Sequence, residues 1–267
     1  MRPTPLPPSQ RASLARSLLQ WWGGWWQVIH FAAQIGVLAL SPSSYRRSQR
    51  QQIGQRIYQA TMPLLPGFTA ISALVALVII RIVLATALSY GLSRYALDVL
   101  VRTLVLELIP LSAALFAAVR YAIPAGEQVR SMRLAGQFET QLAAGRDPTR
   151  DWVLPRAAAA MVAVITLAAV SSALTLVLAY FSVYGFSTWG MAGFTRTVGQ
   201  VFNPVIVLIF VLKTLFLSLA VAVIPMVPTP REGAAAAGQA NADMVRFGRL
   251  LAVILLIELL SLVGNYY

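Results

Sequence analysis

Residues 202–226 read FNPVIVLIFVLKTLFLSLAVAVIPM, an apolar run that contains one charged residue, Lys213. A helix of about 20 apolar residues crosses the roughly 30 Å hydrocarbon core of a bilayer, so this run predicts a membrane-spanning helix. A helix is favoured there because it satisfies its backbone hydrogen bonds internally. The Lys213 ammonium group then needs a polar partner, because a charge at mid-membrane is disfavoured by roughly 2.5 to 3.5 kcal/mol.

Four further apolar runs have the same character and lie at about 62–92, 97–123, 153–184 and 247–264. The composition agrees, because 58% hydrophobic residues, 11% charged residues and a mean hydropathy of +0.71 exclude a soluble domain. We therefore predict an all-α polytopic membrane protein with about five transmembrane helices. Residues 1–60 form a predicted cytoplasmic N-terminal segment, and residues 61–267 form the transmembrane domain.

The net charge of +12 is distributed in a way that orients the chain. Arginines concentrate ahead of the first run, between the second and third runs, and between the fourth and fifth. Because positively charged loops stay in the cytoplasm, we predict a cytoplasmic N-terminus and a C-terminus on the outer side. Anionic lipid headgroups account for arginines spread over three loops, so the sequence predicts no nucleic-acid partner.

An amphipathic helix is predicted over about 13–38. Arg16, Gln20, Gln27, His30 and Gln34 recur at helical spacing, and leucines and tryptophans line the other side. Such a helix lies flat in the headgroup layer. His30 has no nearby Asp, Glu or Cys with which to form a metal site or a catalytic base, so we interpret it as structural.

A second amphipathic helix is predicted over about 128–144, on the cytoplasmic side between the second and third runs. Its polar and apolar arcs supply the candidate contacts for a partner that grips this helix. These candidates are Arg130, Met132, Arg133, Leu134, Gln137, Phe138, Gln141 and Leu142. A helix of this kind can also rest on the membrane surface without any partner, and the sequence leaves that alternative open.

The chain lacks the motifs of an enzyme. No G-x-x-x-x-G-K-[ST] run is present to hold nucleotide phosphates, and no Ser/His/Asp or metal-ligand cluster is apparent. The absence of cysteine excludes disulfides and thiolate metal sites. We therefore predict no catalytic residue, no metal and no cofactor, and any nucleotide hydrolysis must come from another polypeptide.

The order of motifs along the chain resembles the MlaE-type permease family, the membrane subunits of lipid-transporting ABC systems that work with MCE proteins. The resemblance rests on Glu107-Leu108-Ile109-Pro110, Ala113-Ala114, Arg120, Ser131-Met132-Arg133, Gln137, Asp147-Pro148, Pro155-Arg156, Lys213, Gly238, Ala240 and Glu258. It covers the chain from about residue 60 to the end. No single motif is highly specific, and their joint order carries the resemblance.

The resemblance implies a permease subunit in the bacterial inner membrane that moves phospholipid or a similar hydrophobic lipid. Its implied partners are cytoplasmic ABC ATPase subunits, an MCE-domain periplasmic protein and a second permease chain, in a homodimer or a heterodimer. Residues 128–144 would then be the coupling helix that the ATPase engages. Closure of the ATPase would shift that helix and change the lipid cavity between the permease chains.

A diacyl lipid needs an apolar chamber and a few polar groups for its phosphate. The candidates for headgroup contact are Arg81, Arg102 and Lys213, and Glu107 and Glu258 are their expected counter-charges. The alternative is an intramembrane ion pair that only fixes the packing of helices. For Arg81 a third interpretation is that its long side chain reaches the membrane surface.

The chain also departs from the family pattern at several positions. Ile109 stands where a glycine is usual, Gln128 and Gly136 stand where the family tends to have glutamates, and Gln239 replaces a usual arginine. The loss of acidic groups near the predicted coupling helix bears on how this chain contacts its ATPase.

Two functions of other classes compete with this interpretation. An ion-coupled secondary transporter could use Glu107 and Glu258 as a proton relay, although the sequence shows no internal repeat and no matched pair of broken helices. A membrane scaffold without a transport role is the other. Dependence of lipid movement on ATP, and not on a proton gradient, distinguishes the lipid permease from the first rival.

Overall fold

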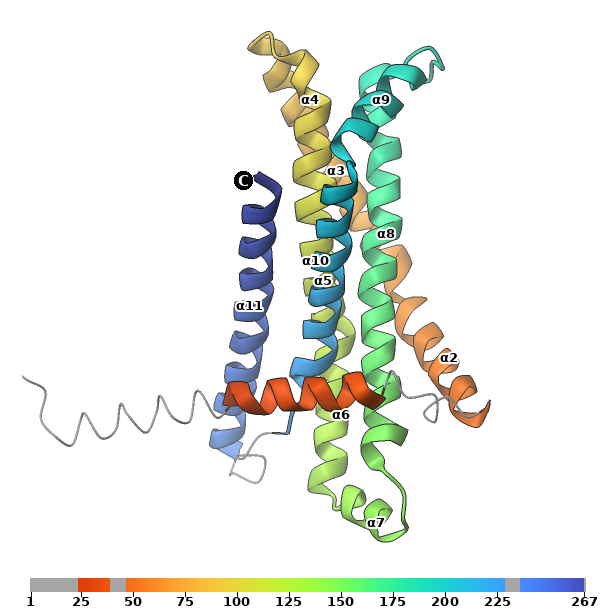
Figure 1. Ribbon diagram of the computed structural model, residues 1–267, viewed down its shortest axis with the longest axis vertical. Coiled ribbons are helices and arrows are strands. Elements are labelled where there is room, and N and C mark those ends of the chain that lie inside the picture. The colour runs from red at the N-terminus through yellow and green to blue at the C-terminus, as the bar shows by residue number, and fades with distance from the viewer. Residues whose placement is uncertain (1–23, 39–46, 229–235, 267) are drawn as a thin grey trace, which may run out of the picture.

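The computed structural model describes residues 24–38, 47–228 and 236–266, and these residues form helices and no strand (Figure 1). A helix over 24–38 comes first. The elements that follow are α2 (Arg47–Thr61), α3 (Leu64–Ser89), α4 (Ser93–Leu100), η2 (Val101–Leu108), α5 (Ile109–Ala117), η3 (Ala118–Ala122), α6 (Ile123–Leu134), α7 (Gln137–Ala143), η4 (Thr149–Val153), α8 (Leu154–Tyr184), α9 (Met191–Val201), α10 (Pro204–Val223), η5 (Ile224–Met226) and α11 (Ala236–Tyr266).

Five helical stretches are long and apolar enough to cross a bilayer, which confirms the predicted all-α membrane fold. They are Ile53–Ser89, Tyr95–Leu134, Thr149–Tyr184, Pro204–Met226 and Asp243–Asn265. The second stretch has 40 residues and, at 1.5 Å per residue, extends about 60 Å. It therefore projects well beyond the hydrocarbon layer, at the end of the bundle that carries α7 (Figure 1). We call this end the α7 end.

Local sequence explains where the long helices begin and end. Asn203 caps α10, because its Oδ1 accepts a hydrogen bond from the Ile206 backbone N–H (2.9 Å), and Pro204 fits the first turn. Pro155 occupies the first turn of α8 for the same reason. At the far end of α8, Gly185 has a φ of 67°, a left-handed conformation that favours glycine and ends the helix.

Helix α8 is the centre of the bundle and contacts α2, α3, α5 and α10. Small residues make this close approach possible: Ala113 and Ala117 of α5 are fully buried, as are Ala160 and Ala163 of α8. Alanines at helix contacts let backbones approach closely and increase van der Waals packing, which drives helix association where lipid removes the hydrophobic effect.

The predicted amphipathic helix over 13–38 falls partly outside the described residues, and residues 24–38 of it are helical. Phe31 and Ile35 are buried against the bundle, whereas Trp26 and Ile29 are exposed. This helix runs across the long helices near the α7 end (Figure 1). Its orientation suits a membrane boundary, because one face packs on protein and the opposite face, which carries Trp26, is exposed.

The prediction of one helix over 128–144 is wrong. Helix α6 ends at Leu134, and the separate helix α7 begins at Gln137. Gly136 lies between them with a φ of 70°, which a continuous right-handed helix cannot contain. Residues 128–134 therefore belong to the long second stretch. The α6–α7 turn caps a helical hairpin that projects from the bundle and returns through η4 into α8.

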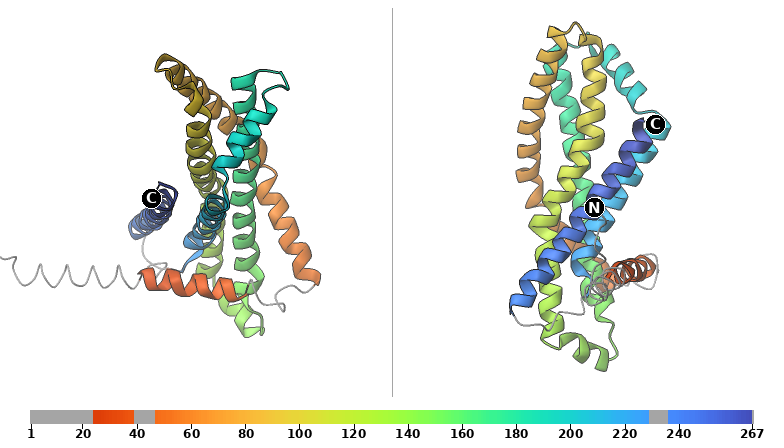
Figure 2. Two further views of the ribbon diagram at one scale, coloured as in Figure 1. Left: turned by 45° about the horizontal axis from the view of Figure 1, so that its top comes forward. Right: turned by 90° about the vertical axis from the view of Figure 1, so that its left-hand side faces the viewer.

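Helix α11 lies at the side of the bundle and packs mainly on α10, with further contacts to η5 and α5. The two additional views show it crossing obliquely past the long helices (Figure 2). Leu255, Leu256, Leu259 and Leu260 are all exposed on it. Of the five stretches, this one is therefore held largely through a single neighbouring helix.

Candidate functional site

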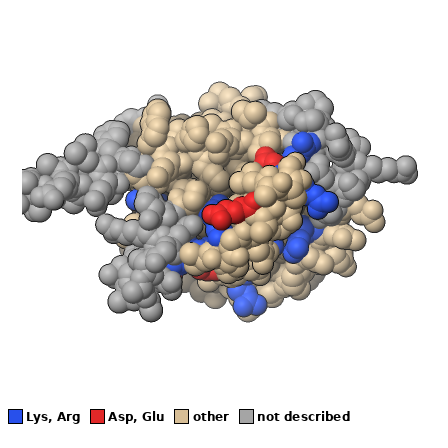
Figure 3. Space-filling view, turned by 90° about the horizontal axis from the view of Figure 1, so that it is seen from below, with Lys and Arg blue, Asp and Glu red and all other residues tan. Residues whose placement is uncertain are grey.

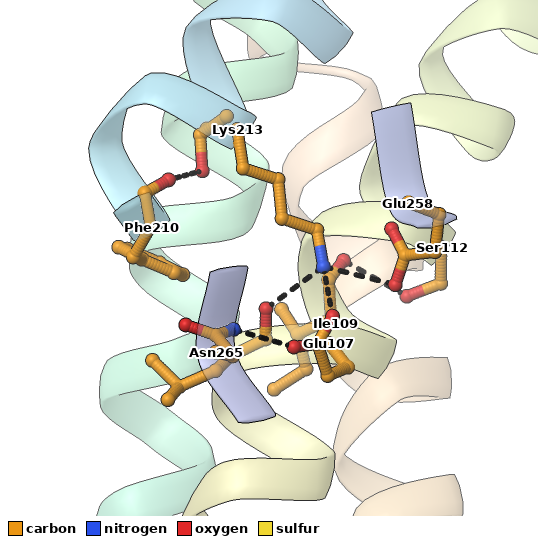
Figure 4. A network of polar contacts seen from close by, with 9 residues as sticks. Glu107, Ile109, Ser112, Phe210, Lys213, Glu258 and Asn265 are labelled. Atoms are coloured by element: carbon orange, nitrogen blue, oxygen red, sulfur yellow. Dashed lines mark hydrogen bonds and ion pairs between the residues drawn. The ribbon is translucent and has the colours of Figure 1, made fainter. Parts of the chain in front are cut away.

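Lys213 lies halfway along α10 and is the centre of a buried polar network (Figure 4). Its Nζ donates to Oε2 of Glu107 and to Oε1 of Glu258, the latter at 2.9 Å. Glu107 comes from η2 in the second stretch, and Glu258 comes from α11. Three of the five transmembrane stretches thus meet at one ammonium group. We call these residues, with Asn265, the Lys213 network.

The network uses every donor of the lysine. Besides the two carboxylates, Lys213 Nζ donates to the Leu106 backbone carbonyl at 3.1 Å. An ammonium group has three N–H donors, so none remains for another acceptor in this conformation. The predicted contact between Lys213 and a lipid phosphate therefore requires that one of these three bonds first be broken.

The two carboxylates are held differently. Glu107 accepts at both oxygens, because Oε1 also receives a hydrogen bond from Asn265 Nδ2 at 2.7 Å. Glu258 accepts from Lys213 at one oxygen, and its Oε2 is buried without a hydrogen-bond partner among the described residues. Glu107 is therefore fixed from two sides, and Glu258 is fixed from one.

Burial makes these contacts strong and specific. The Lys213 side chain is 1% exposed, and the Glu107 and Glu258 side chains are each 12% exposed. Breaking such a pair on one side leaves an uncompensated charge in a medium that solvates it poorly. Glu107 also lies in π-helical backbone, which is rare and frequently occurs at functional sites.

The other two predicted intramembrane candidates do not join the network. Arg102 Nε pairs with Asp98 Oδ2 at 3.2 Å along the same helical surface, with both side chains about one-third exposed. Arg81 is exposed on α3. Of the five predicted charges, the structure thus brings together Glu107, Lys213 and Glu258.

A second polar cluster lies toward the α7 end and was not predicted. Arg130 Nη1 of α6 contacts Asp243 Oδ1 of α11 at 2.8 Å and Glu127 Oε2 at 3.5 Å. Arg246 Nη1 contacts Glu127 Oε1 at 3.5 Å and Asp243 Oδ1 at 3.8 Å. We call these four residues the α6–α11 charge cluster. In the sequence, the cluster is indicated only by an acidic residue three positions before an arginine in each helix, Glu127 with Arg130 and Asp243 with Arg246.

The α7 end of the molecule displays basic and acidic side chains close together (Figure 3). A cavity of about 330 Å³ lies beside the α6–α11 charge cluster and includes Ile123 of α6, Pro225 of η5 and Phe247 of α11 in its lining. Helices α6 and α11 are therefore not fully packed against each other at this junction.

The predicted coupling residues have different environments. Arg130 is buried in the α6–α11 charge cluster, and Arg133 Nη2 donates to the Met226 carbonyl at 2.9 Å. The Arg133 guanidinium also lies 5.2 Å from the centre of the Phe138 ring. Both arginines thus tie α6 to its neighbours. The exposed members of the set are Leu134, Gln137 and Leu142, whereas Met132, Phe138 and Gln141 are half-buried.

Packing also fixes the hairpin that carries these residues. Phe138 of α7 meets Trp152 of η4 edge to face, with ring centres 5.6 Å apart. Asp147 Oδ1 accepts a hydrogen bond from the Thr149 backbone N–H at 2.9 Å and shapes the turn before η4. The hairpin is therefore a packed unit in which α7 contacts both α6 and η4.

The chain matches a known family. The sequence model described as Permease MlaE matches residues 53–264, from α2 through most of α11. A comparison with curated proteins found no match. The matched region contains the five membrane-spanning stretches apart from Asn265, the last residue of the fifth, and it includes Glu107, Lys213, Glu258 and the projecting hairpin. This chain belongs to the MlaE permease family.

Proposed function

We propose that the chain is the permease subunit of an ABC transporter that moves phospholipid or a similar lipid between the inner membrane and an MCE-domain periplasmic protein. A separate cytoplasmic ATPase supplies the energy. In this proposal the α7 end faces the cytoplasm, the N-terminus is cytoplasmic, and the C-terminus lies on the periplasmic side. The family membership and the positive loops at the α7 end support this assignment.

The observation that carries the proposal is the saturated ammonium group of Lys213. In the present conformation Glu107, Glu258 and the Leu106 carbonyl occupy its three donors. Displacement of α11 would remove Glu258 and free one donor at mid-membrane. A lipid phosphate is an acidic group that can replace a carboxylate there, so the network can alternate between a closed state and a lipid-binding state.

The projecting hairpin is the proposed binding site for the ATPase. The exposed residues Leu134, Gln137 and Leu142 lie on and beside the α6–α7 turn, at the far end of the long second stretch. A helix of this length is a stiff lever, because its hydrogen bonds run along its whole axis. Movement of the turn by the ATPase would therefore tilt α6 and the span to which it belongs.

The α6–α11 charge cluster is the proposed mechanical connection between α6 and the lipid site. Arg130 joins α6 to Asp243 at the base of α11, and Glu258 lies farther along the same helix. A pull on α6 would thus be transmitted to α11 through a charge-assisted hydrogen bond. The cavity beside the cluster permits the shift. Glu258 would then separate from Lys213.

We also propose that a second permease chain completes the transport unit. Exposed leucines along α11 and exposed apolar residues along α3 provide surfaces for lipid or for that chain. The partner can be identical or different in sequence.

The test is transport in proteoliposomes that contain the chain with its ATPase and its MCE-domain partner. We expect movement of a labelled phospholipid to require ATP and to persist when the proton gradient is collapsed. The Lys213→Ala variant should lose transport while it still assembles with the ATPase. Transport that follows the proton gradient without ATP would favour the ion-coupled secondary transporter instead.

A further inference from the structure

The Lys213 network has an unbalanced formal charge. It contains one ammonium group and two carboxylates, and among the described residues no other basic side chain pairs with Glu107 or Glu258. Helix α5 has no charged residue, and α10 has Lys213 alone. With both carboxylates ionised, the network would carry one net negative charge in the middle of the membrane, where such a charge is strongly disfavoured.

The hydrogen bonds show which carboxylate can accept a proton. Both oxygens of Glu107 already accept hydrogen bonds, from Lys213 and from Asn265, so a proton on either oxygen would face a donor. Oε2 of Glu258 has no partner among the described residues although it is buried. A buried carboxylate oxygen without a donor is costly, whereas a protonated oxygen at that position becomes a donor itself.

Acceptors for that proton lie on the same face of α11. Glu258, Ser261 and Asn265 recur at spacings of three and four, which places them on one side of the helix. Ser261 is 6% exposed and its Oγ has no hydrogen-bond partner among the described residues, and the same holds for Asn265 Oδ1. This face therefore has unpartnered oxygens that a Glu258 hydroxyl could meet after a small rotation of side chains.

We propose that the Lys213 network is a proton-binding site and that its one proton resides on Oε2 of Glu258. Protonation leaves Lys213 paired with an ionised Glu107 and makes the whole network neutral. It also gives Glu258 Oε2 a hydrogen to donate. The site needs no proton gradient, because the proton compensates a charge and is not itself cargo.

The proton on Glu258 would also affect the displacement of α11. This effect rests on the proposed function, whereas the proton site itself does not. When α11 leaves the closed state, Glu258 separates from Lys213 as a neutral carboxylic acid and not as a bare carboxylate. A neutral group is far easier to expose to hydrocarbon. The proton thus lowers the free-energy barrier to the displacement that the transport cycle needs.

Infrared spectroscopy of the purified full-length chain in lipid nanodiscs tests the proton directly. We expect the carbonyl band of a protonated carboxyl group at neutral pH, sensitive to exchange into D2O and lost as the pH rises. The band should be absent in Glu258→Gln and in Glu107→Gln, because either change leaves one carboxylate to balance Lys213. It should persist in Glu127→Gln, the matched control in the α6–α11 charge cluster.

Thermal stability tests the position of the proton. In Glu258→Gln the amide replaces a protonated carboxyl group, so we expect a thermal midpoint close to that of the unaltered chain. In Glu107→Gln the amide N–H2 faces either Lys213 or Asn265, so the midpoint should fall. For the unaltered chain, the folded state binds one proton more than the unfolded state. Its folding equilibrium constant should therefore decrease by up to about tenfold per unit of rising pH, a dependence that Glu258→Gln removes.

Either of two results would overturn the proposal. The absence of a protonated-carboxyl band in the unaltered chain at neutral pH would mean that both carboxylates are ionised, and this measurement needs no variant to fold. A larger loss of stability in Glu258→Gln than in Glu107→Gln would place the proton elsewhere. Neither readout involves transport, so failure here leaves the proposed function to its own test.

Discussion

Arg130 of α6 and Asp243 of α11 are 113 residues apart in the sequence, and their side chains meet at 2.8 Å. This contact joins the base of the most peripheral helix to the hairpin that projects from the bundle. Farther along α11, Glu258 and Asn265 join it to Lys213 and Glu107. Helix α11 is therefore attached by polar contacts at two levels, with the apolar residues Leu250 and Ile254 buried between them.

Removal of Arg130 should uncouple the ATPase from lipid movement. We expect Arg130→Ala to lower the free energy of unfolding by about 1.5 to 3 kcal/mol, because a buried charge-assisted hydrogen bond is lost while the half-exposed Asp243 can be hydrated. ATP hydrolysis should continue with reduced lipid transfer, measured together in proteoliposomes. Arg56→Ala, at an exposed arginine of α2 outside the hairpin, is the control and should leave both rates unchanged.

The Lys213 and Glu258 side chains should behave as a coupled pair. Lys213→Ala leaves both glutamate side chains without the donor that they share, and Glu258→Ala leaves Lys213 with one acceptor fewer. The double variant should lose less stability than the sum of the single variants, with a coupling of about 0.5 to 3 kcal/mol. Thermal denaturation of the four proteins measures this cycle. Strictly additive losses would mean that the two residues act independently.

Gly126 should tolerate no side chain. A Cβ atom at this position of α6 would overlap the backbone carbonyl of Pro225 in η5. We therefore expect Gly126→Ala to destabilise the protein by about 1 to 3 kcal/mol, the usual range for overpacking against rigid atoms. The matched control is Gly199→Ala in α9, where a Cβ meets no neighbouring atom, and a similar loss there would contradict this explanation.

The exposed surface of the hairpin should bind the ATPase. Leu142 of α7 is 61% exposed, so a charge there disturbs little of the permease itself. Leu142→Glu should weaken co-purification with the ATPase while membrane insertion and the thermal midpoint are maintained. Phe186→Ala at the opposite end, where the ring is 93% exposed, should leave co-purification intact. If Leu142→Glu recovers as much ATPase as the unaltered chain, this part of the hairpin does not bind the ATPase.

Hydropathy alone predicted the five membrane-spanning helices, because the requirement for about 20 apolar residues acts on each run separately. It also marked Lys213, Glu107 and Glu258 as residues that need partners. The partners of the charged residues were not predicted correctly in every case. Arg102 meets Asp98 four residues away, an arrangement that helical spacing could have indicated. The contact between Arg130 and Asp243 joins distant segments, and the acid–arginine spacing within each helix does not indicate that the two pairs meet.

The incorrect prediction of a helix over 128–144 has one physical cause. The polar and apolar residues on both sides of Gly136 fit a single helical wheel, but the wheel ignores backbone conformation. With a φ of 70°, Gly136 reverses the chain and starts α7 in a new direction. A residue with a Cβ atom would be strained there, so glycine is the residue that permits this sharp turn.

The decisive experiment links α11 covalently to α10 and measures ATP-driven lipid transfer. The chain has no cysteine, so Ile209→Cys with Gly264→Cys introduces a single pair, at a place where a Cβ on Gly264 would lie 3.5 Å from Cδ1 of Ile209. A short bis-methanethiosulfonate cross-linker, which bridges two thiols and is released by reductant, should abolish ATP-driven lipid transfer in proteoliposomes, and reduction should restore it, while each single variant transports normally. Transfer at an undiminished rate through the cross-linked protein would contradict the proposal that α11 must leave Lys213 for lipid to bind.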